Sequence, residues 1–92
     1  MKKYVFACYD QKTKLYSQPF YAVWPESAIR DFSYAANDPQ TEIYRYSDDF
    51  SLVQLGTFDD ETGRFDSIEG PQTIRYACFL KDNHLNFEPA EA

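Results

Sequence analysis

The sequence has 92 residues, enough for one small domain with a single modest core, and we assign residues 1–84 to that domain. Its composition, with 43% hydrophobic and 26% charged residues, is that of a soluble globular chain, and no apolar run is long enough to span a bilayer. The net charge of −6 argues against autonomous binding to a phosphate backbone, because such binding depends on cationic side chains. Because no apolar run could span a bilayer, we expect a cytosolic protein without a membrane partner.

A β-hairpin is the first predicted element, with strands at residues 4–9 and 15–23. The first of these runs is rich in β-forming residues and ends at a turn signal in residues 10–14. Pro19 cannot donate a hydrogen bond to a neighbouring strand, so it marks an edge position or a bulge in the second strand.

Residues 26–37 are predicted to form the main helix. Pro25 suits the first helical position, and Glu26 is favoured there by the helix dipole. Apolar residues then recur at helical spacing and form one stripe, made of Ala28, Ile29, Phe32, Ala35 and Ala36. The helix is expected to end at Asn37, because residues before a proline avoid the helical conformation and Pro39 follows closely.

A second hairpin is predicted from residues 50–58 and 64–68, with Gly63 supplying the positive φ of its turn. The next stretch fits either the alternation of a strand or the stripe of a helix. Pro71 favours a short helix at about residues 72–81, by analogy with the proline that begins the main helix. Residues 85–92 are polar and are expected to form a flexible tail.

The two predicted turns have related sequences. Each has an aromatic residue followed by Asp, two polar residues, Thr and one turn-closing residue, and a second aromatic residue comes two positions after the turn-closing residue. This likeness predicts an α+β fold with a ββα-ββα pseudo-repeat. Because an isolated hairpin is marginally stable, the two hairpins are expected to pair into a four-stranded antiparallel sheet with the main helix on one face. The other face is then left for the C-terminal segment, a second subunit or a ligand.

Catalytic and metal-binding chemistry is poorly represented in the sequence. Cys8 and Cys78 lie in no CxxC pair, and the sequence has one histidine, His84, so the ligands of a zinc site are lacking. We interpret both cysteines as small buried residues. A disulfide between them is possible only if the elements that carry them meet. Asp48 and Asp49 are better explained as solvated turn residues than as cation ligands. We therefore predict a protein that is not an enzyme and has no cofactor and no metal site.

Strand aromatics close to lysines are the one constellation with a binding rationale, because such side chains can stack single-stranded bases. Core packing and dimer contacts account for them better in an acidic chain. The first turn is basic where the second is acidic, so any contact with nucleic acid is expected on the first hairpin. The candidate nucleic-acid-binding residues are Lys2, Lys3, Lys12, Lys14, Tyr9 and Tyr16.

Several stretches between residues 4 and 65 resemble, in order and spacing, the small nonstructural protein of gokushovirus-type microviruses, which are tailless phages with circular single-stranded DNA. The stretches that carry the resemblance are Tyr4-Val5-Phe6, Tyr9-Asp10, Gln18-Pro19-Phe20, Ser27-Ala28-Ile29-Arg30-Asp31-Phe32, Asn37-Asp38-Pro39, Tyr46-Ser47-Asp48-Asp49-Phe50-Ser51-Leu52, Leu55-Gly56-Thr57-Phe58-Asp59 and Thr62-Gly63.

This resemblance implies a protein made in the infected bacterium, absent from the finished particle and associated with viral DNA replication or the switch to single-stranded synthesis. It implies no catalytic residues. Two hypotheses follow for a protein in the cytoplasm of the bacterial host. The first is a homodimeric adaptor that engages a viral replication protein or a host protein, and the second is a module that binds single-stranded DNA through the first hairpin.

Overall fold

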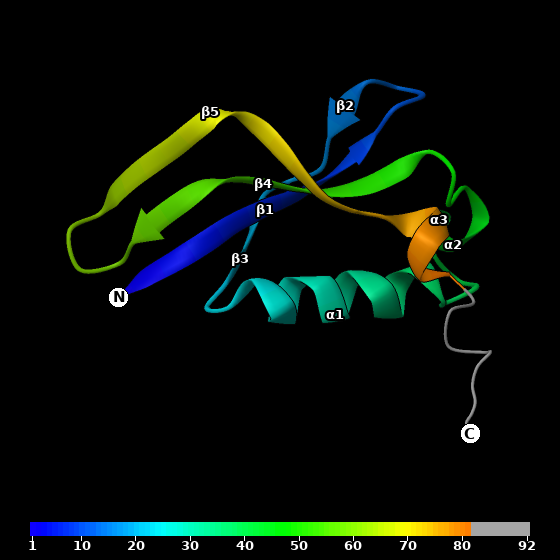
Figure 1. The fold of residues 1–92 in the computed structure, drawn as a ribbon, viewed down its shortest axis with the longest axis horizontal. Helices are drawn as coiled ribbons and strands as arrows, with labels where there is room; N and C mark the ends of the chain where they lie inside the picture. Colours follow the sequence, from blue (N-terminus) through cyan, green and yellow to red (C-terminus); the bar gives the residue numbers. More distant parts are fainter. Residues whose placement is uncertain (82–92) are drawn as a thin grey trace.

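The computed structural model describes residues 1–81, and these form one antiparallel sheet with a helix beneath it (Figure 1). The elements in chain order are β1 (Lys2–Asp10), β2 (Leu15–Tyr16), β3 (Phe20–Ala22), α1 (Pro25–Ala36), α2 (Glu42–Arg45), β4 (Phe50–Asp59), β5 (Arg64–Tyr76) and α3 (Ala77–Leu80). Within residues 1–81, no helix is long and apolar enough to cross a membrane.

The strand order of the sheet is β2-β1-β4-β5, and β3 also pairs with β1. The central pair, β1 with β4, runs antiparallel over the full length of β1, from Lys2 opposite Asp59 to Asp10 opposite Phe50. This register puts the turn after β1 at one end of the sheet and the turn after β4 at the other. β2 and β3 are two pieces of one edge strand, and the interruption between them contains Pro19, as the sequence predicted.

Helix α1 supplies three of the six residues of the main buried cluster, and its bounds confirm the predicted helix to within one residue at each end. Pro25 occupies the first turn, and Asn37 follows the last helical residue. The fully buried cluster joins α1 to β1, β4 and α3 and consists of Phe6, Ala28, Phe32, Ala36, Leu52 and Ala77. The core thus lies between α1 and one face of the sheet.

The helix predicted at residues 72–81 is wrong over its first half. Strand β5 continues to Tyr76, and only Ala77–Leu80 are helical. The reason is a long-range pairing, because Gln72 to Tyr76 lie in register with residues 51–54 of β4 and a strand there satisfies the backbone groups of both. Pro71 therefore begins no helix. It follows Gly70, which has a φ of 77°, and both residues lie in a part of β5 that has no register partner on β4.

The ββα-ββα pseudo-repeat is not confirmed. The first unit has a broken second strand followed by a helix of 12 residues, whereas the second has a continuous strand of 13 residues followed by a helix of 4. The sheet also curls, since the edge strands β2 and β5 rise on the side away from α1 (Figure 1).

The two turns do share their local geometry. Asp10 Oδ1 accepts a hydrogen bond from the Lys12 amide at 3.0 Å, and Asp59 Oδ1 accepts one from the Glu61 amide at 2.9 Å. Each turn closes with a residue of positive φ, Lys14 at 61° and Gly63 at 77°. The sequence likeness therefore encodes a repeated turn rather than a repeated ββα unit.

Candidate functional site

The sheet face opposite α1 carries an exposed aromatic cluster. On β3, Phe20 and Ala22 pack against the core, so Tyr21 between them points to the other face. There its ring lies 5.9 Å from that of Phe58 and 6.4 Å from that of Phe65, and the last two rings are 4.7 Å apart. Tyr21 is 48% exposed and Phe65 60% exposed. This aromatic cluster of Tyr21, Phe58 and Phe65 lies on the sheet face that points away from α1 and is partly exposed.

A second aromatic contact lies at the other end of the sheet. Tyr9 and Tyr16 are opposite each other on β1 and β2, with ring centroids 4.7 Å apart. The turn that joins these strands carries Lys12 and Lys14, both exposed. The structure thus brings together these four of the six residues predicted for nucleic-acid binding.

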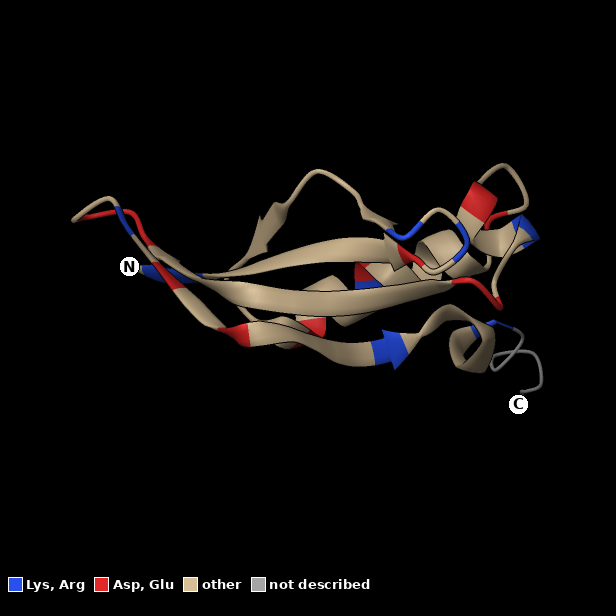
Figure 2. Cartoon of the chain, turned by 90° about the horizontal axis from the view of Figure 1, so that it is seen from above, with Lys and Arg blue, Asp and Glu red and all other residues tan. Residues whose placement is uncertain are grey.

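Between the two aromatic groups the open face is curled into a trough. Val5, Ala7 and Val53 form its floor and are at most 4% exposed, so they are already buried within this chain. Pro19 and Phe65 help to wall a cavity of about 210 Å³ above Val5. The trough is uncharged along the two central strands, which have no Lys, Arg, Asp or Glu between residues 4 and 9 or between 50 and 58 (Figure 2).

The other two predicted residues, Lys2 and Lys3, lie at the opposite end of β1. At about 3.3 Å per residue, β1 separates Lys2 from the basic turn by about 26 Å. Lys3 Nζ lies 3.6 Å from Asp60 Oδ2, and the amino group of Met1 lies 2.7 Å from Asp60 Oδ1. The hydrogen bond from the Met1 amino group to the Asp60 carboxylate raises the pKa of the amino group and lowers the pKa of Asp60. Lys3 and the Met1 amino group therefore pair with the acidic turn, and neither Lys2 nor Lys3 extends the basic one.

Acidic residues also surround the basic turn. A cavity of about 450 Å³ beside it is lined by Lys12 together with Asp10, Glu42 and Asp49. Because these carboxylates offset the positive potential of the turn, the local field favours a phosphate backbone less than the sequence alone suggested.

The two cysteines lie on different elements, Cys8 on β1 and Cys78 on α3. Cys8 and Cys78 are both free thiols and half-buried. Burial raises the pKa of the Cys8 thiol, which keeps it protonated and weakly nucleophilic. Across residues 1–81 no group of three or more His, Cys, Asp and Glu side chains could hold a metal ion. His84 and the predicted tail at residues 85–92 lie outside the described residues.

Comparison with known proteins gives one family. The model of the family described as Phage ORF5 protein matches residues 3–80. Protein ORF5 of Chlamydia phage 1 is 30% identical over 73 residues, which cover 75% of this chain and 76% of that protein. No solved structure matches the chain.

Proposed function

The chain belongs to the Phage ORF5 protein family, as the resemblance to gokushovirus proteins predicted, and from this premise we propose that it is a non-enzymatic protein of viral DNA replication. It acts in the cytoplasm of the infected bacterium, in replication or in the switch to single-stranded synthesis. There it is a dimeric adaptor that holds a viral replication protein or a host protein.

The exposed aromatic cluster, which lies beside the uncharged central strands of the sheet, is the observation that carries this proposal. Protein interfaces are enriched in aromatic residues and depleted of charged ones at their centres. The aromatic cluster of Tyr21, Phe58 and Phe65 and the uncharged trough have this composition. A second copy that covers this face would bury side chains that are otherwise half in water, such as Phe65 at 60% exposure.

Phe65→Lys is expected to convert the dimer to a monomer, because it puts a charge into the aromatic cluster that the partner copy covers. Sedimentation equilibrium measures the change as a loss of the dimer mass at protein concentrations where the unaltered chain is dimeric. Tyr34→Lys is the matched control, since Tyr34 is 75% exposed on α1 and lies off this face. A monomeric unaltered chain, or a dimer that survives Phe65→Lys, would contradict the dimer.

Binding of single-stranded DNA is the second candidate function, and the Tyr9–Tyr16 contact beside Lys12 and Lys14 favours it. Tyr16→Ala is then expected to weaken binding of an oligothymidylate about tenfold, because one stacked base is lost. Lys12→Ala is expected to reduce the salt dependence by about one released counterion.

Fluorescence anisotropy across a salt series checks both changes. Lys2→Ala is the matched control, because Lys2 lies opposite Asp59 at the far end of the sheet and should leave binding unchanged. Absence of binding at low salt would reject this function and leave the adaptor standing.

A further inference from the structure

The outer edge of β5 and the groove beside it form a surface that the open face does not include. We propose that this edge and groove dock an extended acidic peptide segment of a partner protein, which adds as a strand to β5. The inference rests on the adaptor role proposed above and gives that role a binding site separate from the dimer face.

β5 is an edge strand whose residues are mostly exposed. Among the described residues it pairs with β4 on one side and with no strand on the other. Ile68 and Ile74 are the two of its 13 residues that are not exposed. Residues 68–71 of β5 include Pro71 and have no register partner on β4, so the part of this edge that can accept an added strand is residues 72–76. The opposite edge of the sheet is made of two shorter strands and is broken at Pro19.

One hydrogen bond marks where the edge is available. The backbone carbonyl of Ile74 accepts a hydrogen bond from Arg75 Nη1 at 2.8 Å. Ile74 has no register partner on β4, because the pairing is irregular between Leu52 and Val53, so its carbonyl is held by a flexible side chain that the amide of an added strand would replace. Because both groups are exposed, an incoming strand can displace the guanidinium, which is then free to pair with a carboxylate of the peptide.

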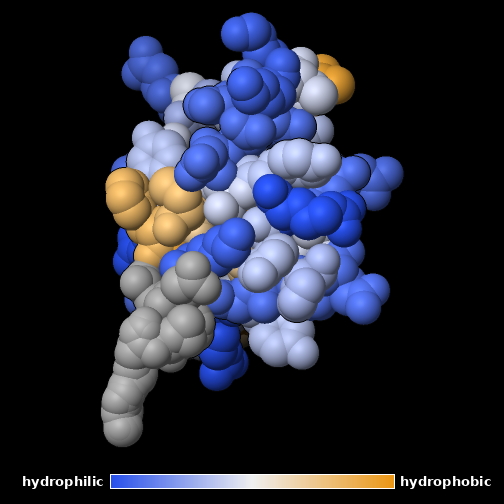
Figure 3. Space-filling view, turned by 90° about the vertical axis from the view of Figure 1, so that its right-hand side faces the viewer, coloured by the Kyte–Doolittle hydropathy of each residue, from blue (hydrophilic) through white to orange (hydrophobic). Residues whose placement is uncertain are grey.

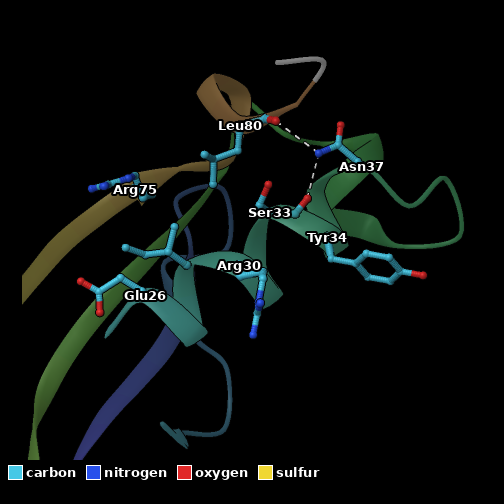
Figure 4. Close-up of a pocket in the computed structure, with 8 residues that line it drawn as sticks. Glu26, Arg30, Ser33, Tyr34, Asn37, Arg75 and Leu80 are labelled. Atoms are coloured by element: carbon cyan, nitrogen blue, oxygen red, sulfur yellow. Dashed lines mark hydrogen bonds between the residues drawn. The ribbon is translucent and has the colours of Figure 1, made fainter. Parts of the chain in front are cut away.

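A groove next to this part of β5 can receive the side chains of an added strand. It has a volume of about 560 Å³ and lies between α1 and the end of β5, with Ile29 and Leu80 among its lining residues. Figure 4 shows Leu80 of α3 pointing toward α1. Asn37 Nδ2 donates to the Leu80 carbonyl at 3.2 Å and to the Ser33 carbonyl at 2.8 Å, and these bonds tie α3 to α1 at one end of the groove.

An apolar surface lies at the same end of the molecule as the groove (Figure 3). Figure 3 shows apolar side chains gathered at this end of the molecule, and Phe79 of α3 is 69% exposed. Since alternate residues of a strand point the same way, a peptide along β5 would direct every second side chain into the groove. Apolar residues at alternate positions are therefore the sequence pattern that this site selects.

The charge around the groove indicates the sign of the ligand. Arg30 of α1, Arg75 of β5 and one acid, Glu26, all line it, and Figure 4 shows Glu26 on the same side as Arg75, with Arg30 extending from α1 away from β5. The ion pairs within residues 1–81 all join Met1 or Lys3 to the acidic turn, so neither arginine has a carboxylate within 4.0 Å. In a chain with 15 acidic and 9 basic residues, such arginines favour an acidic segment.

The test titrates the full chain with the synthetic peptide Asp-Val-Thr-Leu-Thr-Val-Asp and follows backbone amides and methyl groups by NMR. The peptide is expected to shift the amides of residues 72–76 and the methyls of Ile29 and Leu80. Arg75→Glu is expected to weaken binding about tenfold, and a peptide with lysines in place of the aspartates should restore it. Arg64→Glu is the matched control, because it reverses a charge on the same strand away from the groove.

Other occupants are separate outcomes of the same experiment. The proposal is overturned if the peptide does not bind, if it shifts Tyr21 and Phe65 instead, or if the edge amides of the free chain are already protected by residues 82–92 or by a second copy. A peptide that binds a monomeric chain would reject the dimer and retain this site. A dimer that ignores the peptide would reject this site alone.

Discussion

Gly56→Ala is expected to destabilise the protein by about 3 kcal/mol, because the sheet leaves no space for a side chain at this position. A Cβ atom there would lie 2.2 Å from the backbone oxygen of Asp66 and 3.0 Å from Cα of Ser67. Both are backbone atoms of β5, and Gly56 is in register with Ser67, so relief requires the two strands to separate. Urea unfolding followed by circular dichroism measures the loss.

Gly63→Ala is the matched control for this prediction. Its added Cβ would meet no atom within 4 Å, so the cost is that of a positive φ of 77°, about 1 kcal/mol. Equal losses in the free energy of unfolding for the two variants would show that β4 and β5 leave room for a side chain at Gly56. Gly56 also bears on function, because Phe58 and Phe65, which form the aromatic contact on the open face, are register partners two residues further along the same two strands.

Phe6→Ala is expected to cost about 4 kcal/mol, since it removes a large side chain from the centre of the core and leaves a cavity. Phe6 has no exposed surface and lies between β3 and α1, with its ring 6.0 Å from that of Phe20. Thermal and urea unfolding both measure the change in the free energy of unfolding.

Phe65→Ala tests the same chemistry on the other face of the sheet. Because Phe65 is 60% exposed, the expected loss is about 1 kcal/mol or less for a monomer. The contrast between the two phenylalanines would disappear if the open face were packed as tightly as the core, and this outcome would contradict the proposed binding surface.

Interactions between residues close in the chain were predicted well from the sequence. The apolar stripe and the proline at its start located α1, and the Asp and turn-closing residues located both turns, down to the positive φ of Gly63. The alternation of side chains along a strand also divides the strand aromatics, which were predicted as one set, between the two faces of the sheet. Phe6 and Phe20 face the core, whereas Tyr21 points the other way, and this signal was available in the strand pattern.

Pairing between distant strands decided the rest. The register of β1 with β4 puts Lys2 and Lys3 beside the acidic turn. The lysines that were predicted to form one nucleic-acid-binding site therefore lie at opposite ends of the sheet. The same kind of pairing extended β5 to Tyr76, because β4 offered hydrogen bonds that a local helical stripe could not match. The sequence by itself determined the turns, the main helix and the strand-forming runs, since these depend on neighbours in the chain. Only the tertiary structure decided which charges meet, which face stays open and where the β5 groove lies, because those depend on long-range contacts.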